Sequence, residues 1–203
     1  MLERWAHDVK EFCDKLGVEK PVVLGHSFGG FVATKYASMY PDHPSKLIVS
    51  GSLARFDSDV SNDRFRELGG ESVAELFRKV FVDMEFGSFG DFLKEVMPFY
   101  NTTVQDPDSS NRGILNLEVA EHFFTGEYVG MDLRSDVEKI VCPTLVLAGD
   151  SDPMTPPVTA VEYAGLLQNA DARYEVVENA GHGVWRDRPE EAEAILRGLI
   201  FGG

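Results

Sequence analysis

A serine between glycines stands out in the segment GHSFGG at residues 25–30. Gly25, Ser27 and Gly29 form a Gly-x-Ser-x-Gly pattern, which suits a sharp strand-to-helix turn that exposes a serine hydroxyl. That hydroxyl is a weak nucleophile until a neighbouring base removes its proton. The helix N-terminus after it favours negative charge, and the N–H of Phe28 would point at an oxyanion. Ser27 is therefore the predicted nucleophile and Phe28 the predicted oxyanion-hole donor; the alternative is a glycine-rich turn with a capping serine.

Two later segments contain the acid and the base that a serine nucleophile requires. AGDSDPMTPP (148–157) places Asp150 and Asp152 just after one apolar run, and NAGHGVW (179–185) places His182 just after another. If both runs are parallel strands, these residues lie at their carboxyl ends, where open α/β sheets bind ligands. The pattern predicts His182 as the base and Asp152 as the acid that orients it, with Asp150 as the alternative acid.

Short apolar runs alternate with helical patterns, and this alternation predicts an α/β fold with a parallel sheet of about four strands. The first apolar run, PVVLG, is typical of a strand that is buried on both faces. Thr155 is the predicted N-cap of the helix expected at residues 157–168, with Pro156 at the first helical position. The predicted strands are 21–25, 46–51, 144–149 and 174–178, and the predicted helices of the sheet layer are 2–16, 28–40, 157–168 and 189–201.

The segment 52–135 interrupts the alternation and contains no good strand pattern. Helical patterns cover 73–81, 89–100 and 115–124, and Ser72 with Glu75 forms a predicted capping box. Ten of the fourteen phenylalanines lie between residues 56 and 124. The expected organisation is a core of residues 1–51 and 136–203 with a helical cap of residues 52–135. The cap's aromatic side chains either cover a site on the sheet or form only the cap's own apolar core.

The runs LERWAHDVKEFCDKLGVEKPVVLGHSFGGFVA and AGHGVWRDRPEEA resemble the α/β-hydrolase superfamily, in particular its proline-iminopeptidase-like branch. The resemblance implies that Ser27 is the nucleophile, Asp152 the acid of a G-D-x-D-P turn, and His182 the base of a late Gly-His pair. It implies a serine hydrolase that transfers the acyl group of a small ester or of an N-terminal residue amide, without a metal or cofactor. Esterase, lactonase and carbon–carbon bond hydrolase activities remain open, because related folds perform all of them with one triad.

One part of the family's pattern does not occur in this sequence. The family has about four further strands before the first run, with an HGGPG-type turn that donates a second oxyanion N–H. We therefore expect a partial α/β-hydrolase fold that results from a truncated coding region, with an exposed apolar edge on the strand at 21–25. The alternative function is a non-catalytic remnant or binding module, which would form a homodimer through that edge.

Several other polar residues are expected to have structural roles. His26 occupies the variable position of the Gly-x-Ser-x-Gly pattern, where packing away from the substrate is expected. His122 lies beside two phenylalanines of the cap and is the alternative pocket residue. In iminopeptidases, cap carboxylates bind the substrate's free amino group, but no motif assigns that role to Glu118, Glu121 or Glu127, which are predicted to be solvated.

The composition limits the partners of the chain. The 34 acidic residues outnumber 19 basic ones, so the formal net charge of −15 disfavours binding to nucleic acids or to anionic membrane surfaces. No apolar run is long enough to span a membrane, and the first residues lack the apolar core of a signal peptide. Cys13 and Cys142 are far apart and are predicted to be buried thiols. A cytoplasmic enzyme with a small-molecule or short-peptide substrate is expected.

Overall fold

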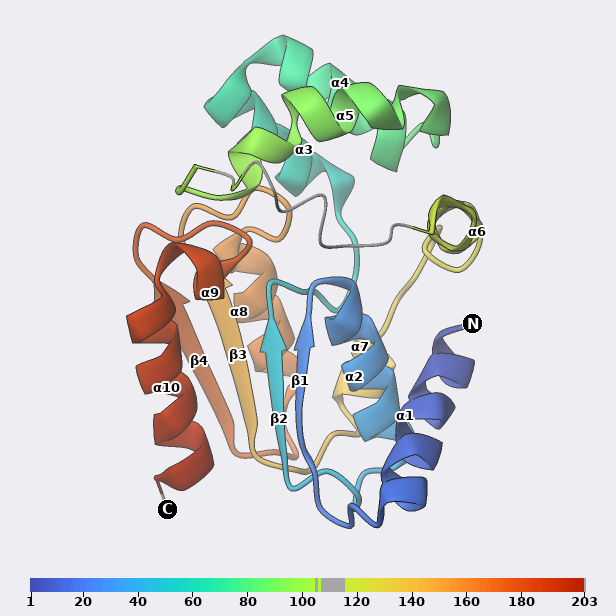
Figure 1. Cartoon of the computed structure of the whole chain (residues 1–203), viewed down its shortest axis with the longest axis vertical. Coiled ribbons are helices and arrows are strands. Elements are labelled where there is room, and N and C mark those ends of the chain that lie inside the picture. The colour runs from blue at the N-terminus through green and yellow to red at the C-terminus, as the bar shows by residue number, and fades with distance from the viewer. Residues whose placement is uncertain (105, 107–115, 203) are drawn as a thin grey trace.

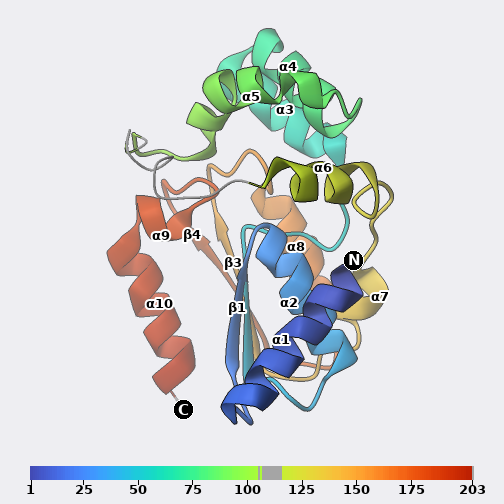
Figure 2. The same cartoon turned by 45° about the vertical axis from the view of Figure 1, so that its right-hand side comes forward.

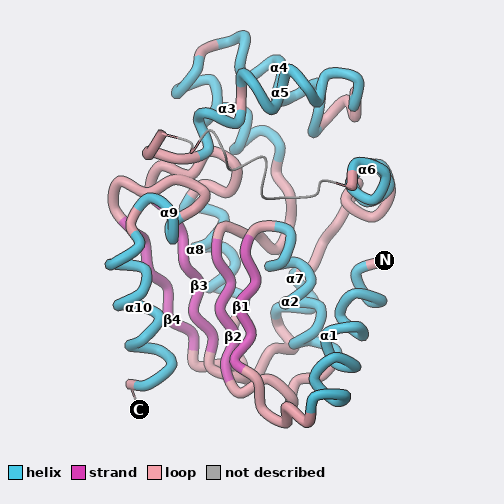
Figure 3. Tube along the Cα trace, in the orientation of Figure 1, coloured by secondary structure: helices cyan, strands magenta, loops and turns pink. Residues whose placement is uncertain are grey.

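A parallel sheet lies at the centre of the molecule (Figures 1 and 3). The computed structural model describes residues 1–104, 106 and 116–202, and within them the sheet has four strands in chain order. All three strand pairs are parallel, so the predicted sheet is confirmed. The strands are β1 (Val22–His26), β2 (Lys46–Ser50), β3 (Thr144–Gly149) and β4 (Ala172–Val177).

Helices cover the two faces of the sheet, because side chains alternate between the faces along each strand. Leu47 and Val49 of β2 join an apolar cluster with α2, α7 and α8. Ile48 points to the opposite face and packs in a cluster with α9 and α10. Figure 2 shows the helices on the two sides of the sheet. These helices are α2 (Phe28–Met39), α7 (Arg134–Val137), α8 (Pro157–Leu166), α9 (Val184–Asp187) and α10 (Pro189–Phe201).

The first helix lies outside these layers. α1 (Leu2–Leu16) packs on α2 and ends at Gly17, which has the left-handed φ of 67° that glycine adopts without strain. The four helices predicted for the sheet layer are thus confirmed within two residues at each end, while the short helices α7 and α9 were not predicted. Among the described residues, no helix combines the length and the apolar character needed to cross a membrane.

β1 forms one edge of the sheet, and its apolar face is partly open. Val22 and Leu24 are 41% and 45% exposed, so the prediction of a strand buried on both faces is wrong. Leu24 is paired in register with Ile48 of β2, which is buried by the cluster around α9 and α10. That cluster includes side chains of β2, β3 and β4 but none of β1. An exposed apolar edge at this strand, the other expectation, is therefore observed.

A group of helices lies beyond the carboxyl ends of the strands (Figure 1). Its apolar cluster continues into the sheet layer, because buried residues of the cap helices pack with Leu2, Phe31 and Leu53. Phe77 stacks between Phe65 and Phe81, at ring-centroid distances of 4.7 and 5.3 Å. The division of the chain at residues 52 and 135 stays a prediction. The helices are α3 (Ser58–Gly69), α4 (Glu71–Phe81), α5 (Phe89–Glu95) and α6 (Leu117–Thr125), with 3₁₀ turns η1 (Phe86–Ser88) and η2 (Met97–Tyr100).

Two helix starts in the cap differ from the sequence prediction. α4 begins at Glu71, with Gly70 in the N-cap position and no side-chain cap, so the capping box of Ser72 and Glu75 is wrong. α3 was not predicted, although Asp57 caps it by accepting a hydrogen bond from the N–H of Asp59. Only Ser61 and Phe65 of α3 are buried, and only Phe65 of these is apolar, so the sequence shows no helical period of apolar residues there.

Candidate active site

Ser27 lies in the turn between β1 and α2, in a strained backbone conformation. Its φ is 51° and its ψ is −122°, a region that residues with a side chain rarely adopt. The turn is held by hydrogen bonds from the Ser27 N–H to the Ser50 carbonyl (2.9 Å) and from the Gly30 N–H to the Ser27 carbonyl (2.8 Å). A Cβ at Gly25 would collide with the Gly29 carbonyl. The Ser27 side chain makes no capping hydrogen bond, so the alternative of a capping serine is not observed.

This strain predicts a measurable difference between two variants that both lack the hydroxyl. Ser27→Gly is expected to be more stable than Ser27→Ala by about 1 kcal/mol, because only alanine keeps a Cβ at positive φ. Urea unfolding of the two purified variants measures this difference in the free energy of unfolding. Equal stability, or a less stable glycine variant, would show that the turn is not strained.

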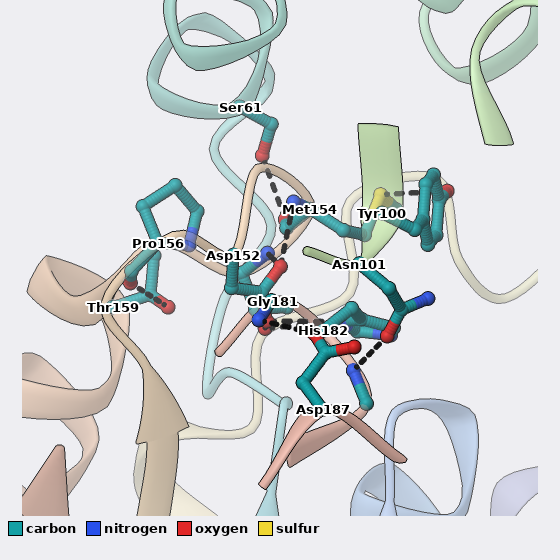
Figure 4. A network of polar contacts seen from close by, with 12 residues as sticks. Ser61, Tyr100, Asn101, Asp152, Met154, Pro156, Thr159, Gly181, His182 and Asp187 are labelled. Carbon is teal, nitrogen blue, oxygen red and sulfur yellow. Dashed lines mark hydrogen bonds and ion pairs between the residues drawn. The ribbon is translucent and has the colours of Figure 1, made fainter. Parts of the chain in front are cut away.

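His182 and Asp152 form a buried acid–base pair at the carboxyl ends of β3 and β4 (Figure 4). The Nδ1 of His182 is 2.9 Å from the Oδ2 of Asp152, and the two residues are 7% and 0% exposed. The other carboxylate oxygen accepts hydrogen bonds from the N–H groups of Met154 and Thr155, at 2.8 and 2.9 Å. The carboxylate is thereby fixed from both sides, with one oxygen left to orient the imidazole.

The structure distinguishes between the two candidate aspartates. Asp150 accepts hydrogen bonds from the Ser151 hydroxyl (2.8 Å) and the Ala180 N–H (3.3 Å), and has no bond to His182. Of the two candidates, it is Asp152 that contacts the imidazole, at 2.9 Å, and its role as the acid stays a prediction. Thr155 is not the N-cap of α8: its hydroxyl donates to Asp152 at 2.6 Å, and Pro156 occupies the N-cap position.

The loop that carries His182 is anchored to the end of η2. The N–H of His182 donates to the Tyr100 carbonyl at 2.6 Å, and the Gly183 N–H donates to the Asn101 side chain at 2.9 Å. The Tyr100 ring meets the imidazole edge to face, with ring centroids 5.4 Å apart. Asp187, which Figure 4 labels, also ties this loop to the segment after η2, because it accepts from the Gly181 N–H at 2.8 Å and from the Thr102 N–H at 2.9 Å. These supporting residues were missed, because nothing in the sequence relates residues 100–101 to residue 182.

His26 packs beneath the acid–base pair. Its ring lies against that of His182, with centroids 4.9 Å apart, and its Nδ1 is buried without a hydrogen-bond partner among the described residues. Burial, followed by the nearby charge of His182, lowers the pKa of His26 to about 4. His26 is therefore neutral near pH 7. The expectation that it packs rather than faces the substrate is observed, since it does not line the cavity at Ser27.

A cavity of about 240 Å³ opens between Ser27 and the cap. Its walls are mainly aromatic and aliphatic side chains, contributed by both the sheet layer and the cap. One hydrogen bond joins His182 to Asp152, and within the described part of the chain none joins His182 to the Ser27 hydroxyl. Gly51 borders both residues, because it lines the same cavity as Ser27 and a Cβ on it would lie 3.2 Å from the His182 Nδ1. Apolar lining residues include Phe28, Phe31, Leu53, Phe92, Leu93 and Phe124.

The strained Ser27 turn and the buried His182–Asp152 pair, at the same end of the sheet, agree with a comparison of the sequence with known families. Residues 2–188 match the family model described as the alpha/beta hydrolase fold. The chain belongs to the α/β-hydrolase family. Esterases, a lipase and a proline iminopeptidase occur among the relatives of this α/β-hydrolase, so its fold is that of a hydrolase.

Two curated relatives and one solved structure illustrate the range of the family. The proline iminopeptidase PfmaB of Pestalotiopsis fici is 30% identical over 178 residues, which are 83% of this chain and 63% of the relative. The putative carbamate hydrolase RutD of Caulobacter sp. is 26% identical over 96% of this chain and 70% of its own length. The proline iminopeptidase of Mycobacterium smegmatis superposes with a TM-score of 0.76 at 20% identity, over 100% of this chain and 72% of that one. The α/β-hydrolase described here thus spans less than two thirds of PfmaB.

The predicted oxyanion donor of this α/β-hydrolase lies beside Ser27. Phe28 is the first residue of α2, so its N–H is among the helix donors that have no acceptor within the helix. Its ring lines the cavity and meets Trp5 and Phe123 edge to face, at centroid distances of 4.9 and 4.8 Å. The backbone N–H at this position can therefore donate to an oxygen bound next to Ser27.

Three acidic residues of the cap, Glu118, Glu121 and Glu127, do not line the cavity. Glu118 and Glu121 are exposed on α6, as is His122, so the expectation of a solvated helix face holds and His122 is not a pocket residue. Glu127 accepts a hydrogen bond from the N–H of Leu2 at 2.6 Å and pairs with the Met1 ammonium group. None of the three carboxylates reaches a substrate at Ser27 in this structure.

Proposed function

We propose that this chain is a serine hydrolase that transfers the acyl group of a small ester or of an N-terminal residue amide. Ser27 is the nucleophile, His182 the base and Asp152 the acid that orients it. The observation that carries the proposal is the buried His182–Asp152 hydrogen bond of 2.9 Å at the sheet end where the strained Ser27 turn lines a cavity. The family relationship to proline iminopeptidase PfmaB and to esterases supports both substrate types.

In the proposed reaction, the Ser27 oxygen attacks the substrate carbonyl while the His182 Nε2 takes the serine proton. The Asp152 carboxylate holds a proton on Nδ1, so that Nε2 has its lone pair free, and it stabilises the imidazolium that forms. The Phe28 N–H donates to the oxyanion. His182 then delivers its proton to the leaving group, and water releases the acyl group from Ser27. These steps need no metal or cofactor.

The proposed partner is a small molecule or a short peptide, rather than nucleic acid or a membrane. The net charge of −15 repels phosphate groups, which supports this assignment. Cys13 and Cys142 are both buried and free, which supports a reducing cytoplasmic location.

A non-catalytic remnant or binding module is the second candidate. It is favoured by one observation, the exposed apolar edge of β1 at Val22 and Leu24, through which a homodimer could form. Such a protein would keep the His182–Asp152 pair without an activated serine.

Reaction with a fluorophosphonate, which modifies activated serines, separates the two candidates. We expect one label per native chain, mapped by mass spectrometry to the peptide that contains Ser27, because the proposed base increases the nucleophilicity of that hydroxyl. Heat-denatured protein is the control and should remain unlabelled. Native protein that takes up no label, or that carries it on a different serine, would contradict the proposed hydrolase and favour the binding module.

A further inference from the structure

The cavity at Ser27 has no charged side chain among its described lining residues. Its polar side chains are four hydroxyls, two of which have hydrogen-bond partners among the described residues. The Thr155 hydroxyl donates to Asp152 at 2.6 Å, and the Tyr100 hydroxyl points to the sulfur of Met154 at 3.4 Å. The other two belong to Ser27 itself and to Tyr128. A substrate group in this cavity therefore meets apolar walls and finds no unpaired ion.

The charged side chains that the structure describes in the cap do not line this cavity. A hollow of about 460 Å³ on another part of the cap is lined by Arg55, Asp132 and Arg134, and Ser27 does not border it. Arg134 and Asp132 are bonded to each other there, at 2.9 Å from Nε to Oδ1. The two hollows share Phe81 and Tyr128, so these rings separate the charged surface from the apolar cavity.

We infer that the cavity holds a small, uncharged acyl group, a conclusion that rests on the proposed serine hydrolase function. The acyl group stays bonded to Ser27 until water arrives, whereas the leaving group must depart to solvent. The group that needs enclosing walls is therefore the acyl group. This inference favours the ester over the N-terminal residue amide, whose ammonium group next to the carbonyl would lose its hydration without gaining a counter-ion.

The volume of the cavity limits the length of the acyl chain. About 240 Å³ is below the range of roughly 300–1,000 Å³ that is usual for pockets of drug-sized ligands. The catalytic efficiency, kcat/KM, should rise about fourfold for each methylene that the walls cover. We expect this rise from p-nitrophenyl acetate to the hexanoate, and a fall for the dodecanoate, whose chain exceeds the cavity.

A matched pair of esters tests the charge preference directly. The p-nitrophenyl esters of cyclopentanecarboxylic acid and of L-proline differ by a CH₂ in place of a charged ring nitrogen. Each enzymatic kcat/KM is divided by the ester's own rate with hydroxide, which removes the difference in intrinsic reactivity. After this correction, the cyclopentane ester should be the better substrate by about a hundredfold or more.

Leu93 offers a site at which to change this preference. It lines the cavity but is 42% exposed, so a polar residue there should be compatible with folding. Leu93→Glu should raise the ratio of the corrected kcat/KM for the prolyl ester to that for the cyclopentane ester about tenfold, because the glutamate supplies the missing counter-charge. Leu93→Gln has nearly the same shape without the charge, and it should leave the ratio within about twofold.

Two different failures can be told apart with the same substrates. If the wild-type chain hydrolyses both esters in a Ser27-dependent way but prefers the prolyl ester after correction, the inference is overturned and the hydrolase proposal stands. If neither ester is hydrolysed faster than with Ser27→Ala, the proposed function itself is overturned, and the acyl-group assignment falls with it.

Discussion

Replacing Ser27 with alanine is expected to lower kcat for p-nitrophenyl hexanoate hydrolysis by roughly 10⁴–10⁶-fold. The alanine removes the only atom that can carry the acyl group, while the His182–Asp152 pair and the Phe28 N–H stay in place. A small residual rate is expected, because a helix N-terminus still stabilises an oxyanion when water attacks. Steady-state kinetics, with the spontaneous hydrolysis subtracted, measure the effect.

Ser52→Ala is the matched control for this loss. Ser52 lies at the same end of the sheet, and its hydroxyl is buried without a hydrogen-bond partner among the described residues. It does not line the cavity, so its removal should change kcat by less than about twofold. If Ser27→Ala retained more than about a tenth of the activity, with its circular dichroism spectrum unchanged, Ser27 could not be the nucleophile.

The sequence could place the candidate site residues at one end of the sheet because the segments that carry them are local patterns. The strand-to-helix turn around Ser27 and the position of His182 after a strand both follow from short segments with glycines at fixed positions. A parallel sheet places the ends of its strands together, so residues 125 positions apart or more meet without any further information. The residues alone left Asp150 and Asp152 open, and the choice of Asp152 rests on the resemblance to the G-D-x-D-P turn of the family; the structure shows the hydrogen bond to His182 on Asp152.

The structural features that the sequence did not predict depend on packing between segments that are distant in the chain. Burial of β1 was overestimated because PVVLG is apolar throughout, and its pattern does not reveal that α9 and α10 leave Leu24 uncovered. The support of His182 by Tyr100 and Asn101 comes from a cap segment with no motif. Thr155 was assigned to helix capping from its place before two prolines, but the nearby Asp152 carboxylate takes its hydroxyl instead.

Changing Asp152 to asparagine is expected to lower kcat at neutral pH by about 10⁴-fold. The carboxylate accepts hydrogen bonds on both oxygens: one faces the N–H groups of Met154 and Thr155, and the other faces the Thr155 hydroxyl and His182. An asparagine has one acceptor oxygen and one amide nitrogen. The oxygen will face the two backbone N–H groups, which cannot change from donor to acceptor, so the amide nitrogen will donate to His182.

This exchange reverses the tautomer of the base. A donor opposite Nδ1 makes that nitrogen the acceptor, which places the imidazole proton on Nε2, the atom that must remove the proton from Ser27. The side chain keeps its size, so the melting temperature should fall far less than the activity. Measuring kcat together with the thermal unfolding of the same preparation separates a loss of the correct tautomer from a loss of folded protein.

Asp150→Asn makes the same chemical change two residues away and isolates this effect. Asp150 contacts Ser151 and the Ala180 N–H but not His182, so the variant should keep kcat within about tenfold. A large loss confined to Asp152→Asn would show that orientation of the imidazole, and not negative charge in this loop, supports the reaction. Similar losses in both variants would mean that the whole turn at residues 149–155 positions His182, and that the single 2.9 Å hydrogen bond is not the decisive contact.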